Sequence, residues 1–414
     1  MVYSAPQFFL HFCDPMRPFG VPQMIYQGKG CIQKIPEVLK GEGWKKVMLI
    51  IDPNMLKTDI DKLFKNILSE SEVEYCIFSE IKPNPQETDI KEIGIPMFKE
   101  SQAEALIAVG GGSALDSAKG IAIGADAKRP LKELAGYLRE VGPHTSLPHK
   151  VYPIIAVPTT AGTGSEVIRN AVITDREGYK QVLMHDSILS KYAFCDPTLL
   201  ATLPPRVAAA SGMDALTQAI EAYVSRASND FAETMSLRAI ELIGPHIVPF
   251  YHNRAILGHA DAMSKGCVYQ GIAWNNSYPA QIHGCNHPIT ELLNVSHGEA
   301  CAILLPAFVE WNEVVCKEKF HKVYNLMFSD HPVSTKEFES KMLVEKLIQL
   351  NRQLNILNGK SLTDLGCTEK TIDEIIERQY AKRENFLNAS TNPRTTTKEQ
   401  LKALLMRVMN GEYL

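Results

Sequence analysis

The sequence has no run of the ~18 apolar residues that a membrane-spanning helix requires. It has no run of basic residues interleaved with aromatic ones, and its net charge is −4, so a nucleic-acid-binding surface is not expected. None of its nine cysteines forms a CxxC pair, which disfavours both a thiolate metal site and a disulfide framework. The first 20 residues lack a basic region and a small-residue cleavage site, so they are not interpreted as a signal peptide. We therefore expect a cytoplasmic protein with free thiols.

What is present is a chain of 414 residues with two kinds of pattern, which indicates at least two domains. Residues 1–203 alternate short apolar runs with amphipathic stretches, which predicts a parallel sheet with helices on both faces. Residues 204–414 begin with two prolines and have helical periodicity, including the stretch 264–284. The prediction is an α/β dinucleotide-binding domain at 1–203 and an all-helical metal-binding domain at 204–414.

Small residues follow two of the predicted strands. Gly110, Gly111, Gly112 and Ser113 stand where a strand ends and a helix begins, and glycine there lets phosphate approach the helix N-terminus. The spacing is not GxGxxG, so a plain tight turn remains the alternative. The nine residues of 158–166 hold two glycines and four hydroxyl side chains. We interpret this second loop as a cofactor contact; the alternative is a solvated turn.

Two further strand ends carry candidate cofactor residues. Asp52 ends the strand LIID, where an acid hydrogen-bonds the ribose 2′-hydroxyl of NAD and repels the 2′-phosphate of NADP. A turn-initiating Asp before Pro53 explains the residue equally well. Asn84 and Pro85 follow the next strand, and they also fit a simple turn.

The second half contains two polar pairs at helical spacing. Asp214 and Gln218 are four residues apart, as are His283 and His287, and His297 follows. Side chains at i and i+4 point from the same face of a helix, so each pair can aim at one point. A carboxylate, an amide oxygen and imidazoles suit a divalent metal. The alternatives are a first-turn acid stabilised by the helix dipole and hydrogen-bonded core histidines.

Taken together, these motifs resemble the iron-containing, group III alcohol dehydrogenases over almost the whole chain. The matching pieces are GKGCIQKI, LIID, NP, GGGSALDSAKG, PTTAGTGSEV, DPTLLATLPP, GMDALTQAIEAY, HGCNHP, SHGEACAILLP and NPR. The resemblance implies a Rossmann-like N-terminal domain, a helical C-terminal domain, and NAD(P)-dependent hydride transfer between a small primary alcohol and its aldehyde. It also implies a homodimer or larger homo-oligomer.

The resemblance implies roles for several residues. Asp214, His283 and His297 match its metal ligands, whereas Gln218 stands where most members carry histidine. Gln218 would complete an Asp-Gln-His-His site, with Fe²⁺ expected and Zn²⁺ or Mn²⁺ as alternatives. His287 is assigned to proton relay or substrate contact. A catalytically weakened relative remains a further reading, because an amide is a weaker ligand than imidazole.

The remaining assignments concern cofactor and substrate. Asp116 is placed near the nicotinamide and Lys119 is expected at the surface, and Asp52 favours NAD over NADP. The expected cofactor-binding set is Asp52, Asn84, Pro85, Gly110, Gly111, Gly112, Ser113, Asp116, Thr159, Thr160, Thr163, Ser165 and Lys180.

Arg169 and Asn275 are candidates for the substrate cleft. Arg169 there would favour an anionic aldehyde, and pairing with a surface acid is the alternative. Metal-dependent lyases resembling dehydroquinate synthase share the expected architecture. They require several Lys and Arg residues around a phosphate, and the region 214–297 supplies few.

Overall fold

The structure is a computed structural model that describes residues 19–21, 24–381 and 390–414. The amino-terminal residues 1–18, which include Cys13 and most of the segment not interpreted as a signal peptide, lie outside the described residues. Within the described part of the chain, no helix is both long enough and apolar enough to cross a membrane.

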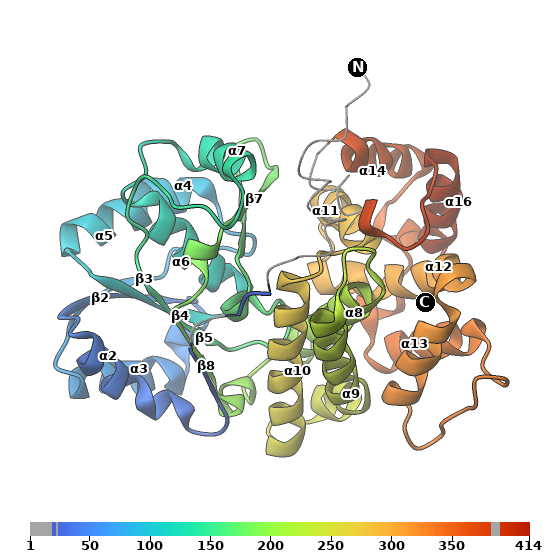
Figure 1. Ribbon diagram of the computed structural model, residues 1–414, viewed down its shortest axis with the longest axis horizontal. Coiled ribbons are helices and arrows are strands. Elements are labelled where there is room, and N and C mark those ends of the chain that lie inside the picture. Colours follow the sequence, from blue (N-terminus) through green and yellow to red (C-terminus); the bar gives the residue numbers. More distant parts are fainter. Residues whose placement is uncertain (1–18, 22–23, 382–389) are drawn as a thin grey trace. The chain divides into compact units, whose positions relative to one another are not determined.

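A six-stranded parallel sheet forms the centre of the N-terminal region (Figure 1). Valine and isoleucine are common in its strands, and the central strands β5, β4 and β2 are buried on both faces, as expected for a parallel sheet covered by helices. Leu49, Ile107 and Ile155 stand side by side in register across these three strands. The spatial order is β1 (Met24–Gln27), β8 (Tyr192–Cys195), β5 (Ile154–Pro158), β4 (Ala105–Gly110), β2 (Lys46–Ile51) and β3 (Glu74–Phe78).

Two apolar clusters, one on each face, hold helices against this sheet. Val47, Leu49 and Ile51 of β2 pack with α2 and α3, whereas Met48 and Ile50 pack with α5, α6 and α7. This alternation follows from the two-residue period of a strand. The helices are α2 (Ile35–Glu42), α3 (Asp59–Glu70), α4 (Glu87–Asp89), α5 (Ile95–Ser101), α6 (Gly112–Gly124) and α7 (Leu131–Val141).

An antiparallel pair, β6 (Asn170–Thr174) and β7 (Lys180–Met184), follows the second glycine-containing loop. This pair of strands was not expected from the sequence. Its turn is held by Asp175, whose Oδ1 accepts hydrogen bonds from the backbone N–H groups of Glu177 and Tyr179 at 3.0 and 2.8 Å. Gly178 takes the left-handed conformation with φ 83°, which suits glycine.

The chain from residue 205 onward is helical, and the described residues of 205–414 contain no strand. The predicted combination of a parallel α/β sheet with a helical C-terminal region is therefore confirmed. The helices are α8 (Pro205–Val224), α9 (Asp230–His252), α10 (Leu257–Asn275), α11 (Gln281–Leu293), α12 (His297–Met327), α13 (Ser340–Gln353), α14 (Glu369–Ala381) and α16 (Lys398–Met409).

The expectation of continuous helix over 264–284 is wrong, because α10 ends at Asn275 and α11 begins at Gln281. Tyr278 has φ 67°, and Pro279 removes a backbone donor and restricts the residue before it. The Asn276 side chain bonds the Gly20 and Ile272 carbonyls at 2.9 and 2.8 Å. The break allows α11, which carries His283, to run in a new direction.

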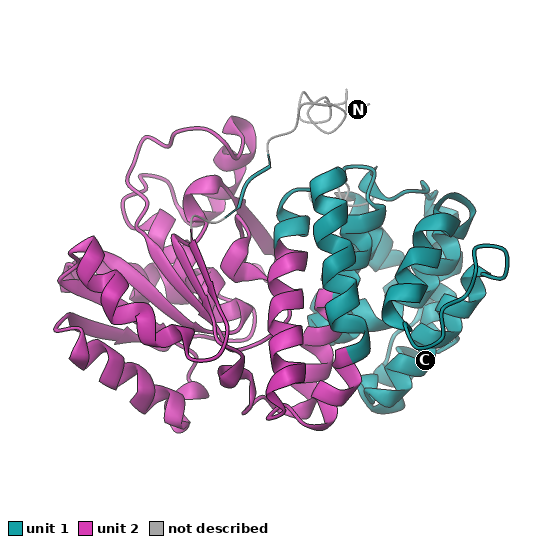
Figure 2. Cartoon of the chain, turned by 60° about the horizontal axis from the view of Figure 1, so that its bottom comes forward, with its two compact units in different colours: residues 1–21, 216–245, 272–414 teal, residues 22–215, 246–271 magenta. Residues whose placement is uncertain are grey.

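The chain divides into two compact units (Figure 2). One comprises Leu216–Pro245 and the described residues of Ile272–Leu414, together with the described residues before 22. The other comprises the described residues of 22–215 and His246–Gly271. Helix α8 is continuous through residue 215. The predicted domain boundary at 203/204 stays a prediction.

Candidate functional site

Helix α8 presents three buried polar side chains at helical spacing. Asp214, Gln218 and Glu221 follow one another at intervals of four and three residues, so they share one face of the helix. All three are at most 5% exposed. Uncompensated burial of carboxylates is costly, so this face requires partners for Asp214 and Glu221.

The partner of Glu221 is the start of α11. Its Oε2 lies 2.5 Å from His283 Nδ1, and its Oε1 accepts the Ile282 backbone N–H at 2.8 Å. The Trp274 ring packs edge-on against the His283 imidazole with centroids 4.4 Å apart. A carboxylate on Nδ1 assigns the proton to that nitrogen and leaves Nε2 as the atom with a lone pair for a metal.

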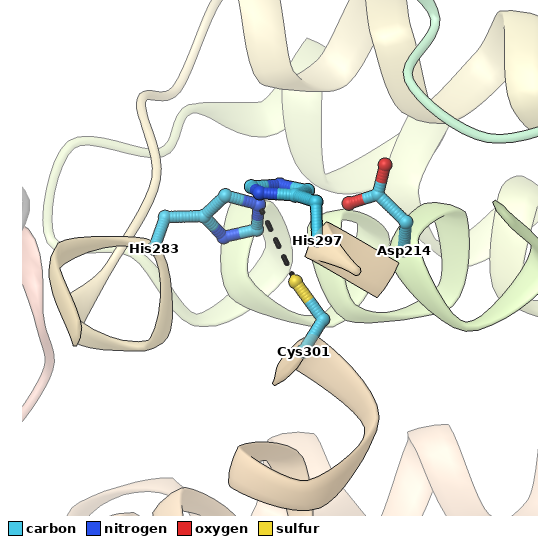
Figure 3. A group of neighbouring side chains, drawn as sticks. All are labelled: Asp214, His283, His297 and Cys301. Carbon is cyan, nitrogen blue, oxygen red and sulfur yellow. Dashed lines mark hydrogen bonds between the residues drawn. The ribbon is translucent and has the colours of Figure 1, made fainter. Parts of the chain in front are cut away.

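Helix α12 begins at His297, and Cys301 lies one turn further along. Asp214, His283, His297 and Cys301 each offer one ligand atom, and these atoms all lie within 4.8 Å of one another (Figure 3). The two imidazoles, the carboxylate and the thiol point toward one another. One oxygen, two nitrogens and one sulfur form a donor set that fits a divalent transition metal.

Cys301 is absent from the ligands expected from sequence, because the cysteines lack CxxC spacing. The available signal was the interval of four residues between His297 and Cys301, the same signal that drew attention to Asp214 and Gln218. Glu221 was also missed. The available signal was again helical spacing, because Glu221 continues the face of α8 that carries Asp214. Coordination by Gln218, one turn from Asp214, stays a prediction.

His287 lies beside the four-residue group. It stands one turn beyond His283 on α11, is half-buried, and has its ring centroid 5.8 Å from that of His297. Asn286, its neighbour, donates from Nδ2 to the His297 carbonyl at 2.8 Å and thereby ties α11 to the start of α12. The proton-relay role of His287 is a prediction that this position permits.

In the N-terminal region, the glycine loop after β4 packs directly on the loop after β5. A Cβ at Gly112 would lie 2.7 Å from Thr163 Cγ2, and one at Gly111 would lie 3.1 Å from Thr160 Cγ2. The Thr159 N–H donates to the Gly110 carbonyl at 2.9 Å. Close packing therefore accounts for the glycines without a ligand. Gly111 is also the N-cap of α6 and has no side chain to cap its first N–H groups, so this helix end suits an anion.

The expectation that Lys119 lies at the surface is wrong. Its side chain is fully buried, and the three N–H groups of Nζ are shared among the Ser165 hydroxyl oxygen and three carbonyl oxygens at 2.7–2.9 Å. Burial lowers the pKa of Lys119 to about 8, against the opposing attraction of Asp116 and Glu166. The ammonium group cross-links α6 to the loop after β5 and to the start of β6. The carbonyls belong to Ser165, Ile168 and Asn170.

Asp116 belongs to the same network. Its Oδ1 accepts the Ser165 hydroxyl at 2.6 Å, and its Oδ2 accepts the Val172 N–H at 2.9 Å. Burial raises the pKa of Asp116, and Lys119 and these hydrogen bonds oppose the shift. Asp116 and Ser165 thus have structural partners, and their contact with a cofactor stays a prediction.

The other expected cofactor residues lie at turns or strand ends. Asp52 Oδ1 accepts hydrogen bonds from the backbone and side-chain nitrogens of Asn54 at 2.8 and 3.0 Å, which is the turn geometry considered from sequence. Asn84 has φ 59°, and the Pro85 carbonyl accepts the Thr174 N–H at 2.7 Å. Lys180 begins β7, and its positive charge is one of the influences that oppose the raised pKa of Asp116.

Arg169 is 5% exposed, and its Nη1 donates to Asp186 Oδ1 at 2.7 Å. Pairing with a partly exposed acid is the alternative that the sequence left open. His144 contacts the same carboxylate, with its Nδ1 2.6 Å from Asp186 Oδ2. Asn275 Nδ2 reaches the Gly20 carbonyl only at 3.5 Å, a weak hydrogen bond. Substrate contact by Arg169 or Asn275 stays a prediction.

Comparison with known proteins assigns this arrangement to a family. Residues 22–197 match the model described as iron-containing alcohol dehydrogenase, and residues 208–409 match the C-terminal model of the same family. The chain belongs to the iron-containing alcohol dehydrogenases. The resemblance expected from sequence is thus confirmed.

Individual members of the family match along almost their whole length. The chain is 30% identical to the 1,3-propanediol dehydrogenase of Klebsiella pneumoniae, covering 94% of this chain and 98% of that protein. It is also 30% identical to the lactaldehyde reductase of Escherichia coli strain K12, covering 90% and 94%. The crystal structure of a 1,3-propanediol oxidoreductase aligns with a TM-score of 0.86 at 30% identity, covering 95% and 100%. These matches confirm the expected class, an oxidoreductase acting on alcohols and aldehydes, and disfavour the lyase reading.

Proposed function

We propose that this protein is a metal-dependent alcohol dehydrogenase and aldehyde reductase that uses NAD and acts on a small primary alcohol or its aldehyde. The observation that carries the proposal is the convergence of Asp214, His283, His297 and Cys301, whose ligand atoms lie within 4.8 Å of one another. Family membership supports the reaction class. Fe²⁺ is the expected metal from the family, with Zn²⁺ and Mn²⁺ as alternatives.

In this proposal a bound divalent cation supplies Lewis acidity toward the oxygen of the alcohol or aldehyde. Asp214, His283 and His297 hold it, with Gln218 as the further ligand expected from sequence. Glu221 fixes the ring of His283 and keeps its proton on Nδ1, so that Nε2 is available as a ligand. His287 exchanges a proton with the substrate oxygen.

The nicotinamide cofactor is proposed to bind at the loops 110–113 and 158–165. The uncapped start of α6 supports phosphate binding there, because its N–H groups and dipole attract anions. Asp52 at the end of β2 supports NAD over NADP. Replacing Asp52 with Gly should raise the ratio of kcat/KM for NADPH to that for NADH by about tenfold, through loss of charge repulsion. An unchanged ratio would remove Asp52 from cofactor selection.

One experiment tests the proposed reaction. The protein is stripped with a chelator, reloaded with Fe²⁺, Zn²⁺ or Mn²⁺, and mixed with NADH and short aldehydes, some neutral and some anionic. We expect metal-dependent loss of NADH absorbance. Cofactor binding without turnover under any of the three metals would contradict the proposal and favour a catalytically weakened relative. A preference for anionic aldehydes that Arg169→Ala abolishes would assign Arg169 to the substrate.

The assembly and location are also proposals. A homodimer or larger homo-oligomer follows from the family resemblance, and sedimentation equilibrium of the purified protein measures it directly. A cytoplasmic location is expected from the lack of paired cysteines, with eight of the nine seen as free thiols in the described residues.

A further inference from the structure

We propose that Cys301 binds the metal as a thiolate and supplies the strong fourth ligand that Gln218 cannot. The proposal rests on the metal site of the proposed function and changes its chemistry. It arises from two features of one site: an amide where most members of the family carry imidazole, and a thiol one turn after His297.

The distances suit coordination. Cys301 Sγ lies 3.8 Å from His283 Nε2. In a tetrahedral zinc site with a Zn–S bond near 2.3 Å and a Zn–N bond near 2.05 Å, the sulfur and nitrogen stand about 3.6 Å apart. The pair therefore already has the spacing of two ligands on one ion. In Figure 3 this contact is a hydrogen bond between the thiol and Nε2, and a metal would take the place of the shared proton.

The surroundings of the sulfur favour an anion. Asn286 is fully buried, and its Nδ2 donates to Cys301 Sγ at 2.8 Å. The Thr290 hydroxyl donates to Asn286 Oδ1 at 2.9 Å, which fixes the amide so that its NH₂ group faces the sulfur. A donor held against sulfur stabilises a thiolate more than a neutral thiol, because charge-assisted hydrogen bonds are stronger. Asn286 therefore orients Cys301 as Glu221 orients His283.

The charge on the ligands also differs between the two cases. With Gln218 as the fourth ligand, Asp214 is the single anionic ligand, and the buried Glu221 carboxylate behind His283 supplies a second negative charge near the ion. With the Cys301 thiolate, two anionic ligands contact the ion directly, and the thiol proton leaves to solvent as the metal binds. An anionic ligand in direct contact attracts a divalent ion more strongly than a neutral amide does. Thiolate also shifts preference toward Zn²⁺ and away from Mn²⁺, which prefers oxygen ligands.

Cobalt substitution tests the proposal with a readout other than activity. The full-length protein is stripped and titrated with Co²⁺, and its near-ultraviolet spectrum is recorded. A thiolate ligand produces an intense sulfur-to-cobalt charge-transfer band that nitrogen and oxygen ligands do not produce. We expect the band in the wild type, its loss in Cys301→Ser, and its retention in Cys316→Ser. Cys316 is a buried cysteine on the same helix, about 22 Å further along its axis.

The variants should also differ in metal selectivity. Cys301→Ser should weaken Zn²⁺ binding by more than the 10–100-fold that loss of an orienting partner typically costs, with a smaller change for Mn²⁺. A protein that binds Co²⁺ without the band, or a band that survives in Cys301→Ser, overturns the proposal and leaves the proposed function standing. A wild type that binds no divalent metal overturns both.

A measurement without any substitution covers the case in which Cys301→Ser fails to fold. X-ray absorption of the zinc-loaded wild type should show one sulfur near 2.3 Å together with nitrogen or oxygen ligands near 2.0–2.1 Å. A shell of nitrogen and oxygen alone would exclude the thiolate ligand.

Discussion

Two polar clusters of this protein bury charge in opposite ways. The Ser165 hydroxyl bonds both the Lys119 ammonium and the Asp116 carboxylate, and these two charged groups also bond backbone, so the cluster is complete within the fold. Around His283, buried partners hold the imidazole and the Cys301 thiol so that Nε2 and Sγ face each other at 3.8 Å. A shifted pKa alone does not distinguish structural from functional charge. What distinguishes them here is whether the buried groups satisfy one another or converge on a common point.

The largest expected effect comes from removing one of the converging ligands. His283→Ala and His297→Ala should each lose the metal, and kcat/KM should fall on the order of 1000-fold, because Lewis acidity contributes several kcal/mol. Elemental analysis of the purified variants, beside circular dichroism to check folding, measures this. Activity that persists in a folded, metal-free variant would contradict the proposed function.

The next effect concerns the complete cluster. Lys119→Met should lower the free energy of unfolding by about 3 kcal/mol, because it leaves buried carbonyl and hydroxyl oxygens without their donor. Urea denaturation compares it with Lys62→Met, at a highly exposed lysine on α3. Metal affinity should remain unchanged. Equal stability of the two variants would mean that the Lys119 network adds nothing to the fold.

A smaller effect is expected behind the histidine. Glu221→Gln keeps the size of the side chain but weakens its hold on His283 Nδ1 and the Ile282 N–H. Zinc affinity should fall by about 10–100-fold, measured by competition with a chromophoric chelator. If the affinity is retained, Glu221 serves only to balance charge within the helices and does not position a ligand.

The smallest effect tests the loop packing. Gly112→Ala places a methyl group 2.7 Å from Thr163 Cγ2, which should cost about 1–2 kcal/mol in stability and weaken NADH binding several-fold. Gly136→Ala on α7 is the control, since its Cβ would meet no atom within 4 Å and alanine favours helix. Titration of NADH fluorescence and thermal unfolding report the two consequences. Equal NADH affinity and equal thermal stability of both variants would show that the two loops accommodate the added methyl group without cost.

The sequence predicted features that depend on local spacing. Hydrophobic periodicity identified the central strands β2, β4 and β5 and most helices, since strands buried on both faces form continuous apolar runs. Helical spacing selected the pairs Asp214–Gln218 and His283–His287, and the family resemblance implied Asp214, His283 and His297, which the structure brings together. Helical spacing was not applied to Cys301, although four residues separate it from His297, as in the two selected pairs. The pair β6–β7 was missed because its strands are short and only partly buried.

Tertiary structure decided what spacing cannot show. A lysine is normally solvated, and only the carbonyls around Lys119, 46–51 residues away in sequence, make its burial favourable. Likewise, Glu221 meets His283 across 62 residues. The sequence by itself determined the fold class through local periodicity, and it determined three of the converging side chains through helical spacing together with the family motifs that contain them. Which buried charges are satisfied and which converge was decided by long-range contacts, since the partners of a buried group are set by packing and not by order along the chain.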